Sequence, residues 1–274
     1  MSESNLLTSV QMAHFASDGF VRFDNIIDRD LCDEFYKHLQ DPAHKTLTRE
    51  GALLEDVWPA DSPIRRVFFH PRVKGVIQSL VGPNPRYDHH AAHETHPGGS
   101  VQILHQDSEY DPRRSAFDIQ LSFFPQDTPL NLGGTRFLPS SHFRRVNESV
   151  VGRYQHVRGM TQIVCEAGTL VAWHANLWHG AQPNTSPDRL RYMFKLRLNP
   201  MVKQQRLFNT SDLGSDEILP ILGRAYPWHG QSHRRECINR IHFWRLVSGQ
   251  PDFDFNLWLT RVSNVPQAIY SNQA

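Results

Sequence analysis

The first 86 residues place apolar side chains at helical spacing, every three to four positions along short segments. Residues suited to helix ends stand at the borders of these segments. For example, Thr8 and Gln11 have the spacing of a capping box, and Gly19 can end a helix. The elements predicted here are a helix from Thr8 to Asp18, a strand from Phe20 to Phe23, a helix capped by Asp28 with Leu31, Phe35 and Leu39 on one face, and a helix from Pro71 to Gly82. This N-terminal part is expected to be a scaffold.

From Tyr87 to Asn199 the pattern changes to short apolar or alternating runs separated by Pro, Gly, Asn and Asp. Such runs predict a mostly antiparallel β-structure, and their frequency favours a sandwich or small barrel. The predicted strands are Ser100–His105, Phe117–Phe124, Arg136–Leu138, Thr161–Cys165, Thr169–His174 and Leu190–Leu198.

After Asn199 the chain is irregular and then becomes helical again around Arg234–Val247. No repeat, low-complexity tract or linker divides the sequence. We therefore expect one domain over residues 1–274, with a mostly helical N-terminal scaffold (1–86), a β-core (87–199) and a C-terminal cover or lid (200–274). Residues 226–230 could form such a lid or simply cover the β-core, and the sequence does not choose between these roles.

Composition excludes several classes of partner. In 274 residues, 29 Lys and Arg stand against 28 Asp and Glu, so the net charge of +1 gives no bulk attraction to nucleic acid or anionic lipid. No apolar run approaches the about 20 residues that cross a bilayer. We expect neither a nucleic-acid nor a membrane partner, and the oligomeric state stays open.

The three cysteines indicate a reducing compartment. Cys32, Cys165 and Cys237 are far apart and odd in number, which argues against a disulfide scaffold or a zinc ribbon. The N-terminus also has no basic region followed by an apolar stretch. A cytoplasmic location is expected.

The candidate chemistry centres on His105, Asp107 and His179. Within a strand, residues i and i+2 project from the same face, so His105 and Asp107 can present an imidazole and a carboxylate to one point while Gln106 points away. A second histidine from a neighbouring strand would complete the two-histidine, one-carboxylate ligand set of non-haem iron, which leaves open positions for other ligands. A solvent-facing strand end explains the isolated His-x-Asp tripeptide equally well.

Arg189 is a candidate anion-binding residue. It follows His179 by ten positions, beyond a Pro-Asn-Thr-Ser-Pro turn, and an antiparallel return would bring its guanidinium to the metal side. The planar guanidinium suits two-point binding of a carboxylate. The alternative is a surface arginine paired with Asp188.

Four more histidines, at positions 89, 90, 93 and 96, stand just before the first ligand pair. They lack a carboxylate or cysteine at metal-binding spacing. We interpret them as a loop or strand edge at the mouth of a pocket and not as a second metal site.

Four motifs together resemble the phytanoyl-CoA dioxygenase family of Fe(II)- and 2-oxoglutarate-dependent oxygenases. They are His-Gln-Asp at 105–107, Asn-Leu-Gly-Gly-Thr-Arg-Phe-Leu-Pro-Ser-Ser-His at 131–142, Gly-Thr-Leu at 168–170 and His-Gly-Ala-Gln-Pro-Asn-Thr-Ser-Pro-Asp-Arg at 179–189. The resemblance covers most of the chain. It implies a mainly β fold with helical flanks around a double-stranded β-helix, the cupin-like jelly roll.

Carried over by position, the resemblance makes His105, Asp107 and His179 the iron ligands and Arg189 the anchor for the 5-carboxylate of 2-oxoglutarate. Arg191 stays open as the alternative anchor. Gln102 falls where relatives often contact this cosubstrate. Halogenating relatives replace the carboxylate ligand with Ala or Gly, so Asp107 favours hydroxylation or a related oxidation.

The implied activity is that of a dioxygenase. Using iron, 2-oxoglutarate and dioxygen, such an enzyme oxidises a C–H bond of a small organic molecule and converts 2-oxoglutarate to succinate and CO2. The alternatives are a metal-binding cupin-like domain without catalytic activity and a nucleic-acid demethylase, which should display a basic groove. The substrate cannot be inferred from these residues, because one fold serves many substrates.

Overall fold

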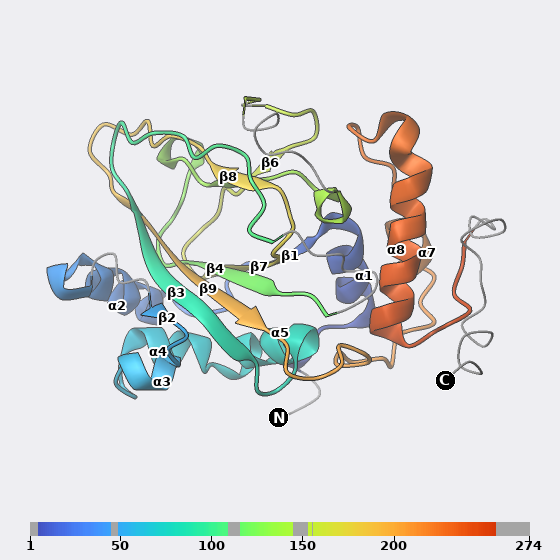
Figure 1. Ribbon diagram of the computed structural model, residues 1–274. Helices are drawn as coiled ribbons and strands as arrows, with labels where there is room; N and C mark the ends of the chain where they lie inside the picture. Colours follow the sequence, from blue (N-terminus) through green and yellow to red (C-terminus); the bar gives the residue numbers. More distant parts are fainter. Residues whose placement is uncertain (1–4, 45–48, 109–115, 145–152, 155, 256–274) are drawn as a thin grey trace.

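The computed structural model describes residues 5–44, 49–108, 116–144, 153, 154 and 156–255. Its helices lie mainly at the two ends of this range (Figure 1). They are α1 (Ser9–Asp18), α2 (Arg29–Gln40), α3 (Leu54–Val57), α4 (Pro63–Phe68), α5 (Pro71–Val81), α7 (Ile218–Leu222) and α8 (His233–Ser248). Short 3₁₀ turns are also present, among them η4 (Ser141–Phe143).

Two antiparallel sheets form the body of the molecule. The main sheet has the order β1-β7-β4-β9-β3-β2, and the smaller sheet has the order β6-β5-β8. Their strands are β1 (Phe20–Phe23), β2 (Arg49–Glu50), β3 (Arg86–Thr95), β4 (Ile119–Phe124), β5 (Thr135–Phe137), β6 (Thr161–Gln162), β7 (Thr169–His174), β8 (His179–Ala181) and β9 (Arg191–Asn199). Antiparallel sheets with helical flanks confirm the predicted fold class.

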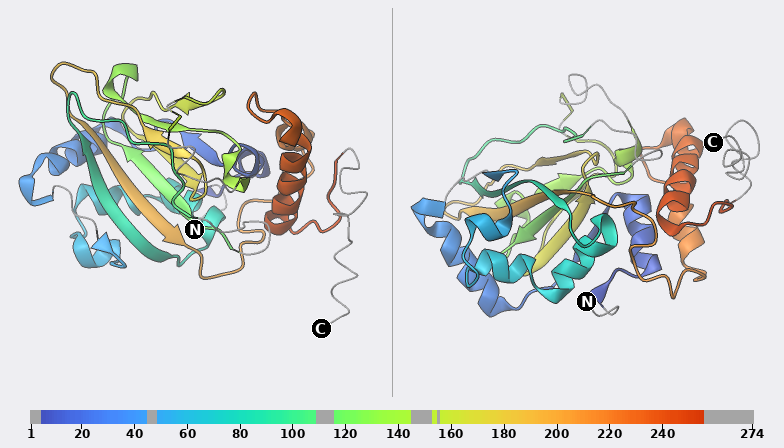
Figure 2. Two further views of the ribbon diagram at one scale, coloured as in Figure 1. Left: turned by 45° about the horizontal axis from the view of Figure 1, so that its top comes forward. Right: turned by 60° about the horizontal axis from the view of Figure 1, so that its bottom comes forward.

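The two faces of the main sheet are covered differently. Figure 1 shows α3, α4 and α5 on one side of this sheet and β6 and β8 on the other, and Figure 2 shows the same layers from two further directions. The helical side holds the largest core cluster, in which Phe123 and Phe194 of the sheet meet Phe35 of α2 and Phe68 of α4. Burial of such large apolar side chains is the main stabilising contribution to a fold.

Several predicted elements are confirmed with small shifts of their ends. The capping box of Thr8 and Gln11 starts α1, and Gly19 ends it in a left-handed conformation with φ of +85°. Asp28 caps α2 by accepting a hydrogen bond from the backbone nitrogen of Leu31 at 2.9 Å. The strand predicted over residues 169–174 is observed with the same bounds.

The strand predicted over Ser100–His105 is wrong. This segment only touches β8 at intervals, through hydrogen bonds from Gln102 N to Ala181 O and between the backbones of His105 and His179. No continuous ladder forms, so His105 takes part in an isolated bridge.

The histidines at 89, 90 and 93 lie on β3, a ten-residue strand that the apolar pattern did not predict. Strand β3 lies between β2 and β9, and its side chains alternate between two covered faces. His90 packs against Phe194 on the helical side, whereas His93 lines a cavity on the other side. Polar residues on both faces hid this strand from a pattern that depends on apolar alternation.

Candidate active site

Backbone hydrogen bonds bring the two halves of the candidate metal site together. The nitrogen of His105 donates to the oxygen of His179 at 3.0 Å, and the nitrogen of His179 donates to the oxygen of His105 at 3.1 Å. The nitrogen of Asp107 donates to Ala175 O, in the turn between β7 and β8, at 3.1 Å. The segment that holds the first two ligands is thus fixed against the strand that holds the third.

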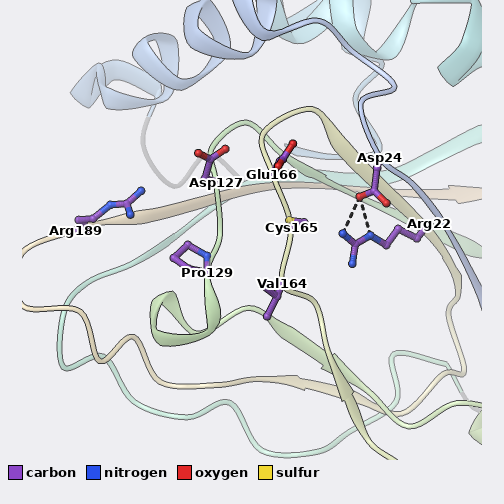
Figure 3. Close-up of a pocket in the computed structure, with 8 residues that line it drawn as sticks. All are labelled: Arg22, Asp24, Asp127, Pro129, Val164, Cys165, Glu166 and Arg189. Carbon is purple, nitrogen blue, oxygen red and sulfur yellow. Dashed lines mark hydrogen bonds and ion pairs between the residues drawn. The ribbon is translucent and has the colours of Figure 1, made fainter.

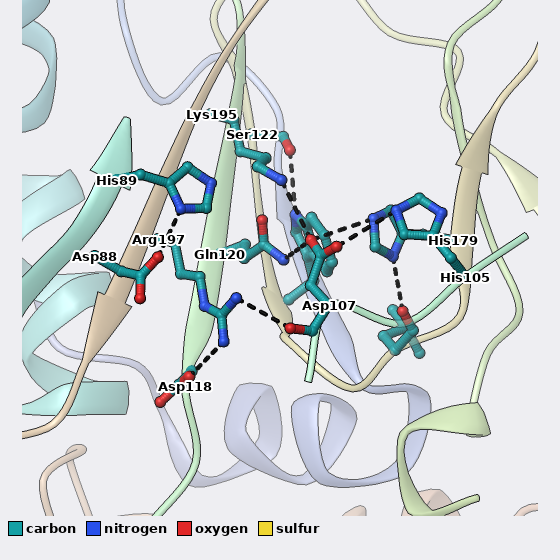
Figure 4. Close-up of polar contacts among 12 residues, drawn as sticks. Asp88, His89, His105, Asp107, Asp118, Gln120, Ser122, His179, Lys195 and Arg197 are labelled. Atoms are coloured by element: carbon teal, nitrogen blue, oxygen red, sulfur yellow. Dashed lines mark hydrogen bonds and ion pairs between the residues drawn. The ribbon is translucent and has the colours of Figure 1, made fainter. Parts of the chain in front are cut away.

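His105, Asp107 and His179 form a compact group of metal-ligand atoms, all within 4.8 Å of one another. The Nε2 atoms of His105 and His179 lie 3.4 and 3.6 Å from the two carboxylate oxygens of Asp107 (Figure 4). Among the described residues, no other group of three or more His, Cys, Asp or Glu side chains could hold a metal ion. A second site built from the histidines of β3 is therefore not found there.

The backbone orients both imidazoles. The Nδ1 atoms of His105 and His179 lie 2.9 Å from the carbonyl oxygens of Ile103 and Leu177. Donation from Nδ1–H to a carbonyl leaves the Nε2 lone pair directed at the shared centre, the tautomer that a metal requires. Two imidazole nitrogens and one carboxylate oxygen fit ferrous iron and leave positions free for further ligands.

The protonation states also suit a metal. Burial lowers the pKa of His179 to about 3, so its ring is neutral at pH 7. For Asp107, burial raises the pKa, but the hydrogen bond with His105 and the electrostatic interactions with His179 and the Lys195 ammonium outweigh burial and hold the pKa well below its usual range. The carboxyl group is therefore ionised, as a metal ligand must be.

Polar residues of the main sheet surround Asp107. Gln120 of β4 donates a hydrogen bond to Asp107 Oδ2, and the ammonium of Lys195 on β9 lies 3.2 Å from the same oxygen (Figure 4). Arg197 donates to the backbone oxygen of Asp107 at 3.0 Å and pairs with Asp118 at 2.8 Å. These residues come from the face of the sheet that is opposite to the helical core.

Gln106 points away from the centre, as predicted. Its side-chain nitrogen donates to the carbonyl oxygens of Arg144 at 2.8 Å and Asn176 at 2.6 Å. Arg144 is in turn held by Glu236 of α8 at 2.9 Å. The middle residue of the tripeptide thereby anchors the ligand segment to the turn before His179 and to the C-terminal part of the described chain.

A cavity of about 190 Å³ adjoins the triad at His179. Arg191, at the first position of β9, lines it and is 3% exposed. Its guanidinium donates to Thr95 Oγ1 at 2.7 Å and to the carbonyl oxygen of Gly133. Burial lowers the pKa of Arg191 to about 10, so the group stays charged at pH 7 and has no carboxylate partner among the hydrogen bonds of the described residues.

The structure does not bring Arg189 to this cavity. Arg189 is exposed and lines a different, open pocket of about 620 Å³ together with Asp127 and Cys165 (Figure 3). The reason is a closed turn before β9, in which the side chains of Asn184 and Ser186 donate to the backbone oxygen of Arg189 at 2.6 and 3.0 Å. The inward-facing alternation begins only at Arg191.

Gln102 does lie at the site. It lines the cavity, and its Nε2 is 3.5 Å from Nε2 of His105. His93 and Ala181 line the same cavity. Burial, with the charges of Lys195 and Arg191, lowers the pKa of His93 to about 4, so its ring is neutral at pH 7.

Sequence reasoning missed the roles of Gln120 and Lys195 at this site. A signal was present in β9, where Arg191, Met193, Lys195 and Arg197 alternate with large apolar residues. Polar side chains at every second position of a strand whose other face is apolar indicate a second, polar environment.

The segment 226–230, for which a lid and a cover were both considered, packs through Trp228 against residues close to the first ligand segment. Trp228 contacts a small cluster that contains Leu104 and Trp178, and its Nε1 donates to Pro139 O at 2.9 Å. Arg144 lies over its ring, 4.0 Å from the centroid.

In the described part of the chain, no helix combines the length and the apolar character that crossing a membrane requires.

Comparison with known proteins identifies related sequences and folds. The family model of phytanoyl-CoA dioxygenase matches residues 15–192. No curated protein matches the sequence. Among solved structures, the 2-oxoglutarate-dependent carbocyclase SnoK from nogalamycin biosynthesis has a TM-score of 0.58 at 16% identity, over 78% of this chain and 92% of that one.

Two further structures are similar to a comparable degree. HygX from Streptomyces hygroscopicus, with nickel and 2-oxoglutarate bound, has a TM-score of 0.57 at 14% identity, over 72% of this chain and 88% of that one. EctD from S. alaskensis, with bound iron, has a TM-score of 0.57 at 19% identity, over 71% of this chain and 77% of that one. At these identities the likeness supports the jelly-roll fold and not a particular reaction.

Proposed function

Because the chain belongs to the phytanoyl-CoA dioxygenase family, we propose that it is an Fe(II)- and 2-oxoglutarate-dependent dioxygenase that hydroxylates a C–H bond of a small organic molecule. The observation that carries this proposal is the convergence of His105, Asp107 and His179 beside a cavity that holds a buried, charged arginine. A non-catalytic metal-binding domain would have no need of that arginine.

His105, Asp107 and His179 would hold the iron, which supplies the activation of dioxygen once 2-oxoglutarate is bound. HygX binds a metal and 2-oxoglutarate in the same fold, and EctD binds iron. The carboxylate of Asp107 would fill the coordination position that halogenating relatives leave to chloride. Oxidation of the C–H bond without halogen transfer is therefore the proposed outcome.

Arg191, and not Arg189, would anchor the 5-carboxylate of 2-oxoglutarate. Its guanidinium is already oriented by Thr95 and Gly133, so little conformational entropy remains to be lost on binding. Arg191 is 3% exposed, so an ion pair with a bound carboxylate would be little screened by bulk water. Gln102 would assist as a polar neighbour of His105 and the cosubstrate.

The other chain residues orient and insulate the centre. The carbonyl groups that accept from both imidazoles keep Nε2 directed inward, and Gln120 fixes one carboxylate oxygen of Asp107. Trp173, which lines the cavity and packs 4.3 Å from the ring of His179, shields it on the core side. Substrate positioning by such a rigid site is what determines which C–H bond reacts.

The test is 2-oxoglutarate turnover in a substrate screen. Purified protein loaded with Fe(II) should release succinate, and the oxidised product should gain the mass of one oxygen atom. Asp107→Ala should abolish succinate release, whereas Asp33→Ala, a change of an exposed acid on α2, should leave it unchanged. Metal binding without any 2-oxoglutarate binding or turnover would instead support the non-catalytic alternative. A product that has lost two hydrogen atoms would show that the reaction is ring closure or desaturation and not hydroxylation.

A further inference from the structure

Lys195 is a partly buried cation beside the candidate metal ligands. It lies on the inward face of β9, its side chain is 14% exposed, and it lines the cavity that Arg191 also lines. Its neighbour across the strand pair is Ala91, which has a small apolar side chain and offers no charged partner. Figure 4 shows Lys195 directed at the carboxylate of Asp107.

The other two cations of this face have partners other than the carboxylate of Asp107. Arg197 pairs with Asp118, and Arg191 donates to Thr95 and Gly133. Within the described residues, the ammonium of Lys195 has a single hydrogen-bond partner, the carboxylate of Asp107. Lys195 therefore depends for its charge compensation on a proposed metal ligand.

Metal binding at Asp107 changes this balance. A carboxylate that coordinates a divalent cation has less negative charge to offer, and the cation repels a nearby ammonium. A buried charge without a partner is strongly unfavourable. Two other acids near this site already have partners. Asp118 pairs with Arg197, and Glu94, which also lines the cavity, pairs with His96 at 2.9 Å.

An anionic ligand would restore the balance, and it could come from the cosubstrate or from the substrate. Arg191 and Lys195 are four residues apart on one strand face, which separates their backbones by about 13 Å. Both ends of 2-oxoglutarate are accounted for in the proposed function, one by Arg191 and the other by the metal. The anion that remains for Lys195 is a group on the substrate.

We propose that Lys195 binds a carboxylate of the substrate, so that the enzyme acts on small organic acids. This inference rests on the proposed function. His93 adjoins the same space with a neutral ring whose Nε2 is buried without a hydrogen-bond partner in the described structure, and it could share the carboxylate as a hydrogen-bond donor. The ammonium would also set which end of the substrate lies away from the reacting carbon.

The experiment measures binding to the anaerobic complex of the protein with Fe(II) and 2-oxoglutarate. The visible charge-transfer band of that complex reports 2-oxoglutarate binding, and its change on titration reports a ligand that enters beside the metal. The probes are two acids, hexanoate and L-proline, each paired with its primary amide. We expect at least one acid to bind about ten- to a hundredfold more tightly than its amide, the range for a hydrogen bond to a charged group.

Variants assign the preference to Lys195. Lys195→Met should remove the preference for the acid and leave the dissociation constant of 2-oxoglutarate within about twofold, whereas Lys195→Arg should retain the preference. Lys203→Met, which changes an exposed lysine after the end of β9, should behave like the unchanged protein. Thermal melting of each variant shows that it is folded, and Lys195→Gln is the substitute if Lys195→Met is not.

The outcomes separate this inference from the proposed function. Absence of the charge-transfer band in the unchanged protein contradicts the proposed function itself. A normal band with no acid bound better than its amide overturns the inference alone. Loss of 2-oxoglutarate affinity in Lys195→Met, by tenfold or more, also overturns it, because the carboxylate at Lys195 would then belong to the cosubstrate.

Discussion

The helical face and the inward face of the main sheet are built from alternate residues of the same strands, yet they serve different ends. On β9, Phe194 and Leu196 point into the helical core, whereas Met193 and Lys195 point toward the cavity. Residues on both faces are largely buried. Burial alone therefore does not separate scaffold from site, and the separation comes from chemistry.

Burying polar groups on the inward face destabilises the folded state, and apolar packing on the helical face offsets this loss. Buried polar or charged side chains are unfavourable unless they are paired, and here Arg191, Lys195 and Gln120 are held in place around a cavity. The apolar side offsets this cost with aromatic packing of Phe35, Phe68 and Phe194. The difference indicates that stability and activity should respond separately to changes on the two faces.

The largest expected effect is on the helical face. Phe194→Ala removes a ring that contacts Phe35, Phe68 and Trp58, so the free energy of unfolding should fall by about 3–5 kcal/mol. Phe194→Leu, which keeps most of the volume, should cost about 1.5 kcal/mol or less. Urea unfolding followed by fluorescence measures both. A loss below about 1 kcal/mol for Phe194→Ala would show that this face does not dominate stability.

A smaller effect, on ligand binding, distinguishes the two candidate arginines. Arg191→Ala should weaken 2-oxoglutarate binding about a hundredfold, because it removes a charged partner from a desolvated site, and Arg191→Lys should fall between this variant and the unchanged protein. Arg189→Ala should change the affinity by less than about twofold. Anaerobic titration of the Fe(II) protein measures these constants, and the reverse order would restore the sequence-based assignment to Arg189.

The smallest effect concerns a histidine on the apolar face. Burial lowers the pKa of His174 to about 3, so its ring stays neutral in the folded protein while the unfolded chain takes up a proton near pH 6.5. The contribution of this group to the free energy of unfolding is complete above pH 6.5 and is lost as the pH falls toward 3. At pH 5 the loss is about 2 kcal/mol. His174→Phe should reduce the slope of unfolding free energy against pH, without abolishing it, because burial also lowers the pKa of His142. Parallel curves for the two proteins would contradict this.

Local sequence signals predicted the helices and the chemistry of the triad. The capping residues of α1 and α2 act within four positions of the chain, so their effect is visible without tertiary structure. The His-x-Asp motif and the distal histidine also predicted the three side chains that the structure brings together, although the reason given was incomplete. His105 and Asp107 converge because β8 and the turn before it hold their backbones, not because they lie on a strand.

The sequence by itself determined the family, the helical caps and the identity of the three candidate metal ligands, since these depend on residue type and motif spacing. Only the tertiary structure decided which arginine faces the cavity. Arg189 and Arg191 are two positions apart, so in one continuous strand both would face the same side, but a turn closed by Asn184 and Ser186 makes β9 begin at Arg191. It also placed Lys195 on Asp107, 88 positions away in the chain. Contacts between distant strands depend on sheet register, and register follows from the packing of the whole core.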